Sequence, residues 1–249
     1  MSQILYRGAP IGGAYSGGNI QALIAEATGN AKTGPALTLW ILPDTADGGD
    51  NPWALIKRNG SASTCGDCPL QDGRCYTHAG ASQVLTAGAA SIVKARSCDT
   101  VTPSRRVRRA RSAAFGDAAA LPLEVLERWR SIRAKYNLAP LGYTHAWRTR
   151  PDLAVDHMAS VETVDDAAAA RAAGWRYFRV RPVGSPLLAG EIQCPASAES
   201  TRANAIDCNR CGLCDGNTRG NRRPSVSIED HGAGAKVAKR ASNSLRIGA

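Results

Sequence analysis

The sequence predicts an α/β protein, built as a partial or full parallel β/α barrel of about six strands with cysteine-rich metal-binding loops. Short apolar segments that end in polar residues alternate with helical segments at least three times along the chain. This alternation is typical of parallel strands joined by right-handed crossovers. A length of 249 residues is enough for one large domain with a substantial core. A doubly wound open sheet is the alternative, but no G-x-G-x-x-G sequence follows a predicted strand, which disfavours a dinucleotide-binding fold.

The first part of the chain predicts three elements. Residues 1–18 are glycine-rich and irregular, and a helix is expected at residues 19–28. Residues 36–42 are short and uniformly apolar, which indicates a buried strand. Residues 82–94 have a helical composition. We therefore expect an N-terminal segment over 1–35, a barrel-like domain over 36–193 with a cysteine loop at 65–75, and a C-terminal cysteine region with a basic tail over 194–249.

The second part of the chain has clearer helix boundaries. Pro122 precedes a helix at residues 123–135, whose apolar residues Leu123, Leu126, Trp129 and Ile132 recur every third position. A second helix is expected to begin after Thr163, its N-cap, and to end at Gly174. Strands are predicted to end at about 114–117 and to occupy 139–145, 155–160, 176–180 and 191–194.

Polar residues follow several of the predicted strands. In a β/α barrel, functional side chains project from the carboxyl ends of the strands, so these residues are expected to line one mouth. Each also has a structural explanation: a turn cap, a core histidine, or an acidic residue at the start of a helix. Those expected to bind substrate or transfer protons are Asp117, His145, Arg148 and Glu162, and those expected to bind a cofactor are Arg179 and Arg181.

Seven of the eight cysteines fall into two groups. The second cysteine group has the pattern C-x2-C-x2-C with a Cys-Pro upstream, which is typical of a cubane iron–sulfur cluster. A zinc site of four thiolates is the main alternative, although structural zinc usually takes two separate C-x2-C pairs. Disulfides are less favoured, because dense bridges belong to small secreted domains without a core. The ligands of this group are Cys194, Cys208, Cys211 and Cys214.

The first cysteine group, Cys65, Cys68 and Cys75, offers only three thiolates. A [4Fe-4S] cluster held by three cysteines keeps one iron open for a substrate or cofactor. Alternatively, a fourth ligand closes the site: His78 would give a Cys3His zinc centre, and Cys98 is the other candidate. Ordinary buried or redox-active thiols are the remaining interpretation.

The net charge of +10 is carried mostly by arginine, and the densest run extends from Arg105 to Arg111. Arginine suits phosphate, so this run indicates a nucleic-acid partner, although basic runs also form solvated faces. No segment approaches the roughly 18 apolar residues of a membrane span, and no signal peptide is recognisable. We therefore expect a cytoplasmic protein that does not bind membranes.

An ordered set of motifs resembles an uncharacterised family of bacteriophage and prophage proteins, sometimes labelled replication-associated. The resemblance covers residues 37–231 and implies the host cytoplasm as location. The motifs are Cys65-x-x-Cys68-Pro-Leu with Gly-x-Cys75-Tyr76, Phe-Gly-Asp117, Gly-Tyr-Thr-His145-x-Trp-Arg148, Met-Ala-Ser-Val-Glu162-Thr, Gly-Trp-Arg-x-Phe-Arg179-Val, and Cys194-Pro-Ala-Ser with Cys208-x-x-Cys211-Gly-x-Cys214.

The arrangement also resembles radical S-adenosylmethionine enzymes, which have three cysteines on an early loop and an auxiliary cluster on later cysteines. This resemblance implies one or two [4Fe-4S] clusters, S-adenosylmethionine as cofactor, Tyr76 against its adenine, and an electron donor protein. The spacing C-x2-C-x6-C departs from the common C-x3-C-x2-C. We thus expect a radical or redox enzyme of unknown substrate, with a zinc- or iron–sulfur-stabilised nucleic-acid-binding protein as the alternative.

Overall fold

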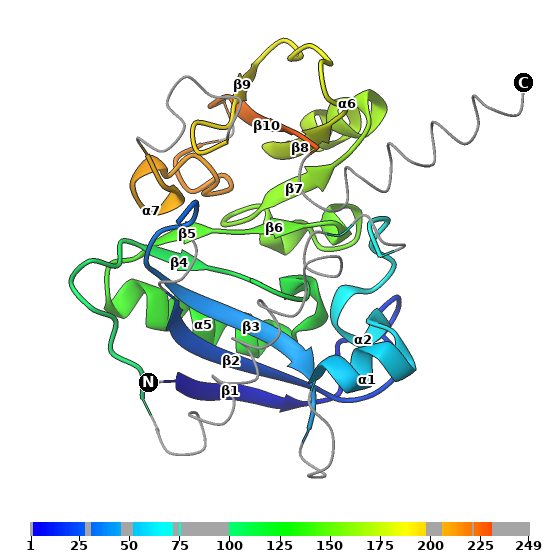
Figure 1. Cartoon of the computed structure of the whole chain (residues 1–249), viewed down its shortest axis with the longest axis vertical. Coiled ribbons are helices and arrows are strands. Elements are labelled where there is room, and N and C mark those ends of the chain that lie inside the picture. The colour runs from blue at the N-terminus through cyan, green and yellow to red at the C-terminus, as the bar shows by residue number, and fades with distance from the viewer. Residues whose placement is uncertain are drawn as a thin grey trace, which may run out of the picture.

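Ten β-strands form two five-stranded sheets in the computed structural model (Figure 1). The structure describes residues 2–27, 31–45, 52–71, 75, 100–197, 206–220 and 222–230. The first sheet has the strand order β1-β2-β3-β4-β5 and the second the order β6-β7-β8-β10-β9. The predicted mixed α/β class is therefore confirmed, whereas the described residues form no closed barrel.

The first sheet is antiparallel on one side and parallel on the other. Strands β1 (Ser2–Gly8), β2 (Ile20–Ala27) and β3 (Ala36–Pro43) pair antiparallel. Strands β4 (Arg109–Arg111) and β5 (Ala139–Leu141) continue the sheet from β3 in parallel. All eight residues of β3 are buried, which agrees with its uniformly apolar sequence.

The helix expected at residues 19–28 is wrong, because these residues form β2. Their alanine, leucine and glutamate favour helix locally, but the segment is paired on both sides, with β1 and β3. Its first six residues are buried. The hydrogen bonds and burial of a central strand outweigh the weak local preference. The irregular segment expected before it also contains a strand, β1.

The second sheet is parallel throughout. Strands β6 (Tyr143–Thr144), β7 (Met158–Val161) and β8 (Tyr177–Arg181) follow one another, and β10 (Ser225–Glu229) lies between β8 and β9 (Glu191–Gln193). Only Gly142 separates β5 from β6. One extended segment therefore leaves the first sheet and starts the second, and all strand pairs from β3 onward are parallel.

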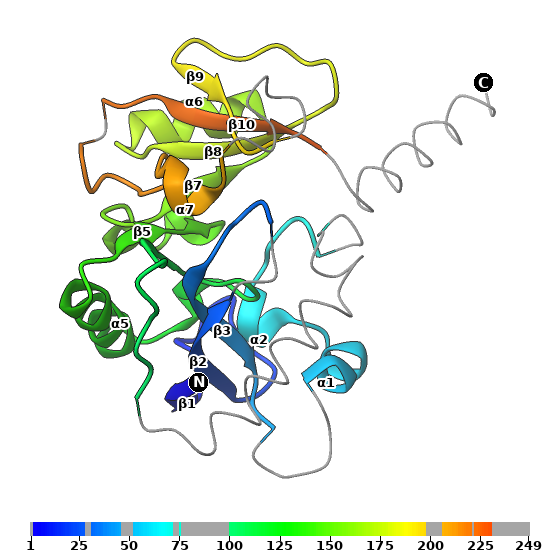
Figure 2. The same ribbon diagram turned by 60° about the vertical axis from the view of Figure 1, so that its left-hand side comes forward.

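Helices cover both faces of the first sheet. Helix α5 (Leu123–Lys135) lies on one side of it, and α1 (Pro52–Asn59) and α2 (Ala62–Cys65) lie on the other (Figure 2). The predicted helix at 123–135 is confirmed, but its buried face is Val125, Leu126 and Trp129, and Leu123 is 47% exposed. The helix expected at 82–94 lies outside the described residues.

Helix α6 (Val164–Ala172) packs against β7 and β8. As predicted, Thr163 is its N-cap, and the Thr163 side chain accepts a hydrogen bond from the backbone N–H of Asp166. Gly174, just beyond the helix, has a φ of 80°. This left-handed conformation is the usual way to end a helix and suits glycine.

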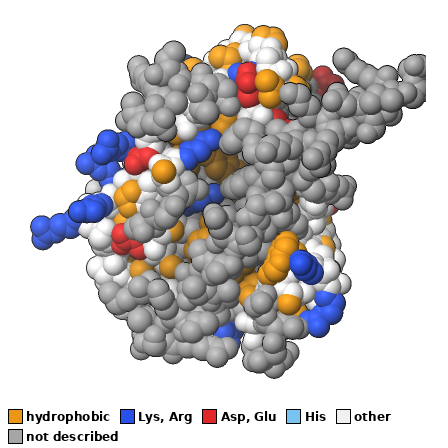
Figure 3. Space-filling view, in the orientation of Figure 1, with side chains coloured by type: hydrophobic (Ala, Val, Ile, Leu, Met, Phe, Trp, Pro, Cys, Tyr) orange, Lys and Arg blue, Asp and Glu red, His pale blue; other side chains and the backbone are white. Residues whose placement is uncertain are grey.

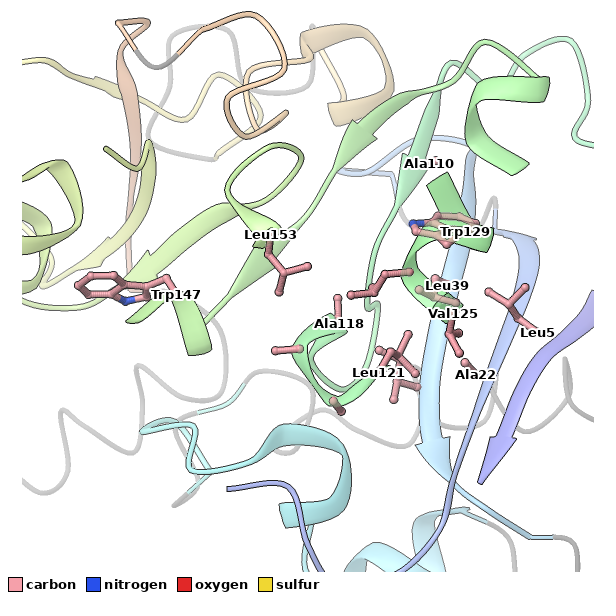
Figure 4. Packing of buried hydrophobic residues seen from close by; sticks show 14 of the residues in the cluster. Leu5, Ala22, Leu39, Ala110, Ala118, Leu121, Val125, Trp129, Trp147 and Leu153 are labelled. Atoms are coloured by element: carbon pink, nitrogen blue, oxygen red, sulfur yellow. The ribbon is translucent and has the colours of Figure 1, made fainter. Parts of the chain in front are cut away.

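One hydrophobic core extends from the first sheet into the second. Leu5, Leu39 and Ala110 of the first sheet face Trp129 of α5 (Figure 4), and the same cluster continues to Trp147 and Tyr177 beside the second sheet. The indole N–H of Trp129 donates to the Ser112 hydroxyl at 3.0 Å, so this buried polar group is satisfied. Within the described residues, no helix is both long and apolar enough to cross a membrane.

Candidate metal sites

The first cysteine group begins at Cys65, the last residue of α2, and continues into a loop of tight turns. The N–H of Cys68 donates to the carbonyl of Cys65 at 3.2 Å, which closes a four-residue turn. Gly66, the second residue of this turn, has φ 58° and ψ −133°, the values of a type II′ turn. A side chain at Gly66 would also contact the ring of Tyr15 at 3.0 Å. Glycine is therefore required here for both conformation and space.

Asp117 joins this loop to the strand ends. Its N–H donates to the carbonyl of Thr64 at 2.7 Å, and Gly116 before it packs so closely that a Cβ would lie 2.7 Å from the Ile41 carbonyl oxygen. The Asp117 carboxylate is buried and accepts hydrogen bonds from the N–H of Ala119, the N–H of His145 and the Thr144 hydroxyl. Asp117 thus positions the end of β6.

His145 connects the first cysteine group to Glu162. Its Nδ1 lies 3.4 Å from Cys68 Sγ, and its Nε2 lies 2.9 Å from Glu162 Oε1. The two side chains of the His145–Glu162 pair are each 19% exposed. Burial lowers the pKa of His145, but hydrogen bonds to Cys68 and Glu162 outweigh it and raise the pKa to about 10. The structure therefore brings together Cys68, Asp117, His145 and Glu162, as expected for residues at carboxyl ends of neighbouring parallel strands.

Buried ionisable groups surround the first cysteine group. Burial raises the pKa of Cys65 to about 12, a hydrogen bond with Thr64 lowers it, and nearby Cys68, Cys75 and Asp117 raise it. Burial also raises the pKa of Tyr15, as do the charges of Asp117 and Cys65. No sequence pattern indicated Tyr15, since it lies far from the cysteines along the chain. Thiolates here would repel one another, so a bound cation would favour their deprotonation.

The remaining residues predicted from the sequence lie elsewhere. Arg148 stacks on Trp147 and contacts Asp166 Oδ1 at 2.5 Å. Arg179 and Arg181 alternate along β8 with Phe178, which lines the second site described below. Arg179 forms a bidentate ion pair with Glu191, both contacts at 2.7 Å, and Arg181 pairs with Glu229 at 2.8 Å. The residues outside the described part of the chain are Tyr76, His78 and Cys98.

The second cysteine group lines a cavity of about 50 Å³. This volume is several times the ~10–15 Å³ that one water molecule requires. These four described cysteines are not joined in disulfides, and they come from the turn after β9 and from α7 (Cys208–Cys211) with the loop that follows it. The cavity wall is otherwise apolar except for two cationic residues and one tyrosine: the lining includes Lys32, Arg109, Tyr143, Phe178, Cys194, Cys208, Cys211, Cys214 and Val226.

Backbone and amide hydrogen bonds hold α7 against the segments that lead into β3 and β4. The N–H groups of Cys208 and Asn209 donate to the carbonyls of Lys32 and Thr33, just before β3. The buried Asn209 amide accepts from the N–H of Arg108 at 2.8 Å and donates to the carbonyl of Arg106 at 2.9 Å. Asp207 caps the helix by accepting from the N–H of Arg210. The cysteines of α7 are therefore held against the chain that enters β4.

A buried ion pair fixes Cys214. Arg176, 1% exposed, donates to Asp215 Oδ1 at 2.8 Å and to the carbonyls of Leu213 and Gly216, on either side of Cys214. Asp215 also pairs with Arg223 at 2.7 Å. Sequence reasoning missed Arg176 and Asp215 as supports of this site. Their separation of 39 residues gives no local pattern, and only the proximity of Asp215 to Cys214 hinted at it.

Burial shapes the acidity of the second cysteine group. It raises the pKa of Cys208 to about 11; Cys194 and Cys211 raise it further, and the charges of Arg111 and Lys32 lower it. Burial also raises the pKa of Cys214, while a hydrogen bond with Tyr143 lowers it. The Tyr143 pKa rises for the same reason, burial first and then the neighbouring thiolates. Cys194 and Cys214 are buried, Cys208 and Cys211 are half-buried, and the cationic side chains of Lys32 and Arg109 line the same cavity.

Single metal ions and clusters differ in how they arrange their protein ligands. Within the residues that the structure describes, no group of three or more His, Cys, Asp or Glu side chains is placed to hold a single metal ion. The four cysteines of the second group line one shared cavity. A tetrahedral zinc brings its sulfur ligands to about 2.3 Å from one centre, whereas a cubane cluster separates them by its own volume.

The arginine run is partly engaged in the fold. Arg109 lines the cavity, and its Nε donates to the carbonyl of Asn209 at 3.3 Å. Arg105, Arg106 and Arg108 are exposed. Lys and Arg side chains project on the side of the molecule where α7 and the chain entering β4 lie (Figure 3). Only part of the run is therefore available to a nucleic acid.

Comparison with known proteins gives no significant match: no protein-family model, no curated protein and no solved structure is similar to this chain.

Proposed function

We propose that this protein is an iron–sulfur redox protein whose [4Fe-4S] cluster is held by Cys194, Cys208, Cys211 and Cys214. The observation that carries the proposal is the cavity that these four cysteines line. The cluster would supply one-electron transfer, because its iron changes oxidation state while the thiolates stay bound. The apolar wall limits water, and Lys32 and Arg109 offset the negative charge of the reduced centre.

The first cysteine group is the second metal site in this proposal. It lies at the carboxyl ends of β3, β4, β6 and β7, the end at which parallel α/β proteins usually react. We suggest that the continuous parallel series from β3 to β9 corresponds to a partial barrel. A radical reaction with S-adenosylmethionine would need an iron with an open coordination position at the first group. This reaction stays a prediction.

Anaerobic purification tests the proposal. We expect a brown protein with broad visible absorption, and an electron paramagnetic resonance signal after reduction with dithionite. Cys194→Ala should abolish both, whereas Cys98→Ala, which changes the cysteine outside both groups, should leave the second-group signal unchanged. A colourless protein with zinc as its sole metal would refute the proposal.

A nucleic-acid-binding protein stabilised by these metal sites is the second candidate. Arg105, Arg106 and Arg108 favour it, since their side chains are exposed while hydrogen bonds with Asn209 fix the backbone at Arg106 and Arg108. Replacing all three with glutamine should weaken binding of single- and double-stranded DNA, and the affinity of the original protein should fall steeply with salt. If neither the three substitutions nor added salt lowers the affinity for DNA, this candidate is excluded.

A further inference from the structure

The contact between Cys68 and His145 has the dimensions of a shared metal ion. Cys68 Sγ and His145 Nδ1 lie 3.4 Å apart, although their residues are separated by 77 positions in the chain. A tetrahedral zinc ion holds sulfur at about 2.3 Å and nitrogen at about 2.0–2.1 Å, which places two such ligand atoms about 3.5 Å apart. The observed separation is that of a hydrogen bond, and the same distance suits two ligands of one ion.

The same distance excludes His145 and Cys68 as ligands of two different irons of one cubane. Each iron of a [4Fe-4S] cluster takes one protein ligand, so ligands of different irons are separated by the cluster itself. Cys68 and His145 are too close to serve two different irons. A single ion satisfies both atoms at once.

Glu162 gives His145 the surroundings of a metal ligand. Metal-binding histidines usually donate their second ring N–H to a carboxylate, which fixes the tautomer and the ring orientation. His145 Nε2 contacts Glu162 Oε1 at 2.9 Å and Nδ1 faces Cys68, so Glu162 can hold the proton on Nε2 while Nδ1 gives up its proton to a bound ion. The N–H of His145 is anchored on Asp117 at 3.0 Å, which fixes the backbone of the ligand as well.

Cys65 and Cys75 supply the other two ligands. The Cys65–Cys68 turn is closed by a hydrogen bond of 3.2 Å, and the N–H of Cys75 donates to the carbonyl of Leu70 at 2.8 Å, which folds the loop back on itself. Cys68 and Cys75 both act on the charge of Cys65, so the three thiols are neighbours. Because the described side chains do not yet converge on one point, Cys65 and Cys75 must turn toward the Cys68–His145 pair when the ion binds.

We propose that His145 is the fourth ligand of the first cysteine group, which binds one thiophilic divalent cation such as Zn²⁺ through Cys65, Cys68, Cys75 and His145. Glu162 is the positioning residue of this site. The inference rests on the proposed function only in that the first group binds metal. Four protein ligands would complete the coordination of the ion at the first group, so electron transfer would belong to the second group alone.

Zinc affinity of the full-length protein tests this inference. The chain is loaded with Zn²⁺ and titrated with a chromogenic chelator. Glu162→Gln should lower the affinity about 10–100-fold, and His145→Ala should lower it further, as much as Cys68→Ser. The matched control is Arg148→Ala in the same loop, which should change nothing because Arg148 contacts Asp166 instead. X-ray absorption at the zinc edge should show three sulfur ligands and one nitrogen ligand.

Two outcomes would overturn the inference. If Cys68→Ser releases zinc but His145→Ala and Glu162→Gln do not, the fourth ligand is another residue. If replacing Cys65, Cys68 or Cys75 changes no metal content, and iodoacetamide alkylates Cys68 faster in the original protein than in His145→Ala, the residues form a nucleophile–base pair. The visible spectrum of the second group, recorded on every variant, reports folding and keeps failure here separate from failure of the proposed function.

Discussion

The two cysteine groups are supported in different ways. The second lies in an apolar cluster with Met158, Val226 and Ile228, and its loop is fixed by the buried Arg176. The first lies on a loop of turns, next to Asp117, His145 and Glu162. The second is thus a preformed cavity of thiols, and the first a set of ionisable groups at strand ends. This difference suits a cluster that keeps its geometry during electron transfer and an ion that organises its own ligands.

The largest effect is expected at the support of the second group. Arg176→Met leaves the buried Asp215 carboxylate short of a partner and the carbonyls of Leu213 and Gly216 without their donor. The free energy of unfolding should fall by about 3–5 kcal/mol. Arg219→Ala removes another partner of Asp215, but Arg219 is 53% exposed, so the loss should stay below about 1 kcal/mol. Urea unfolding measures both, and equal losses would show that the buried pair has no special role.

A smaller effect should appear at the first group with Gly116→Ala. Gly116 has a φ of 82°, and a Cβ would meet the Ile41 carbonyl oxygen at 2.7 Å. Gly184 has a similar φ of 78° but nothing within 4 Å, so Gly184→Ala shows the backbone strain alone. Gly116→Ala should cost about 1–3 kcal/mol more than the control. It should also displace Asp117 and lower zinc binding, and unchanged zinc binding would contradict the positioning role of Asp117.

Acid should lower the stability of the protein through Asp156, which lies close to the Cys214 segment of the second group. Burial raises the pKa of Asp156, but hydrogen bonds from His157 and Arg130 outweigh it and place the pKa below its usual 3.8. Stability from this carboxylate is therefore complete above about pH 4 and is lost as the pH falls below it, by on the order of 2 kcal/mol. His157 packs against Gly142 and Gly216, next to Cys214. Asp156→Asn should flatten the dependence of melting temperature on pH below 4, and an unchanged slope would place the acid-sensitive group elsewhere.

The smallest effect is expected for Arg109→Gln, which should change the reduction potential of the cluster and leave the stability nearly unchanged. Loss of this positive charge beside the cavity should disfavour the reduced cluster and lower its reduction potential, with little change in stability. Arg105→Gln, in an exposed part of the same run, should leave the potential unchanged. A redox titration followed by electron paramagnetic resonance measures both variants. Equal potentials would mean that the cluster does not lie beside Arg109.

The predictions from sequence succeeded where local residues decide the structure. The helix at Leu123–Lys135 and the Thr163 cap follow from short-range signals. The convergence of Asp117, His145 and Glu162 followed from the parallel-strand pattern. Strand β2 was missed because its partners are remote in the chain, and Arg176 because its ion pair joins distant segments. Arg148 was placed near the site by position along the chain, but its side chain pairs with Asp166.

Metal analysis of matched variants tests most directly the claim that the two groups hold different centres. Iron, sulfide and zinc are measured per chain in the anaerobically purified protein, in Cys208→Ala and in Cys65→Ala. We predict about four irons, about four sulfides and about one zinc in the original protein. Cys208→Ala should lose iron and sulfide but keep zinc, and Cys65→Ala should lose zinc alone. Loss of iron and sulfide in Cys65→Ala, or zinc at both groups, would contradict the account.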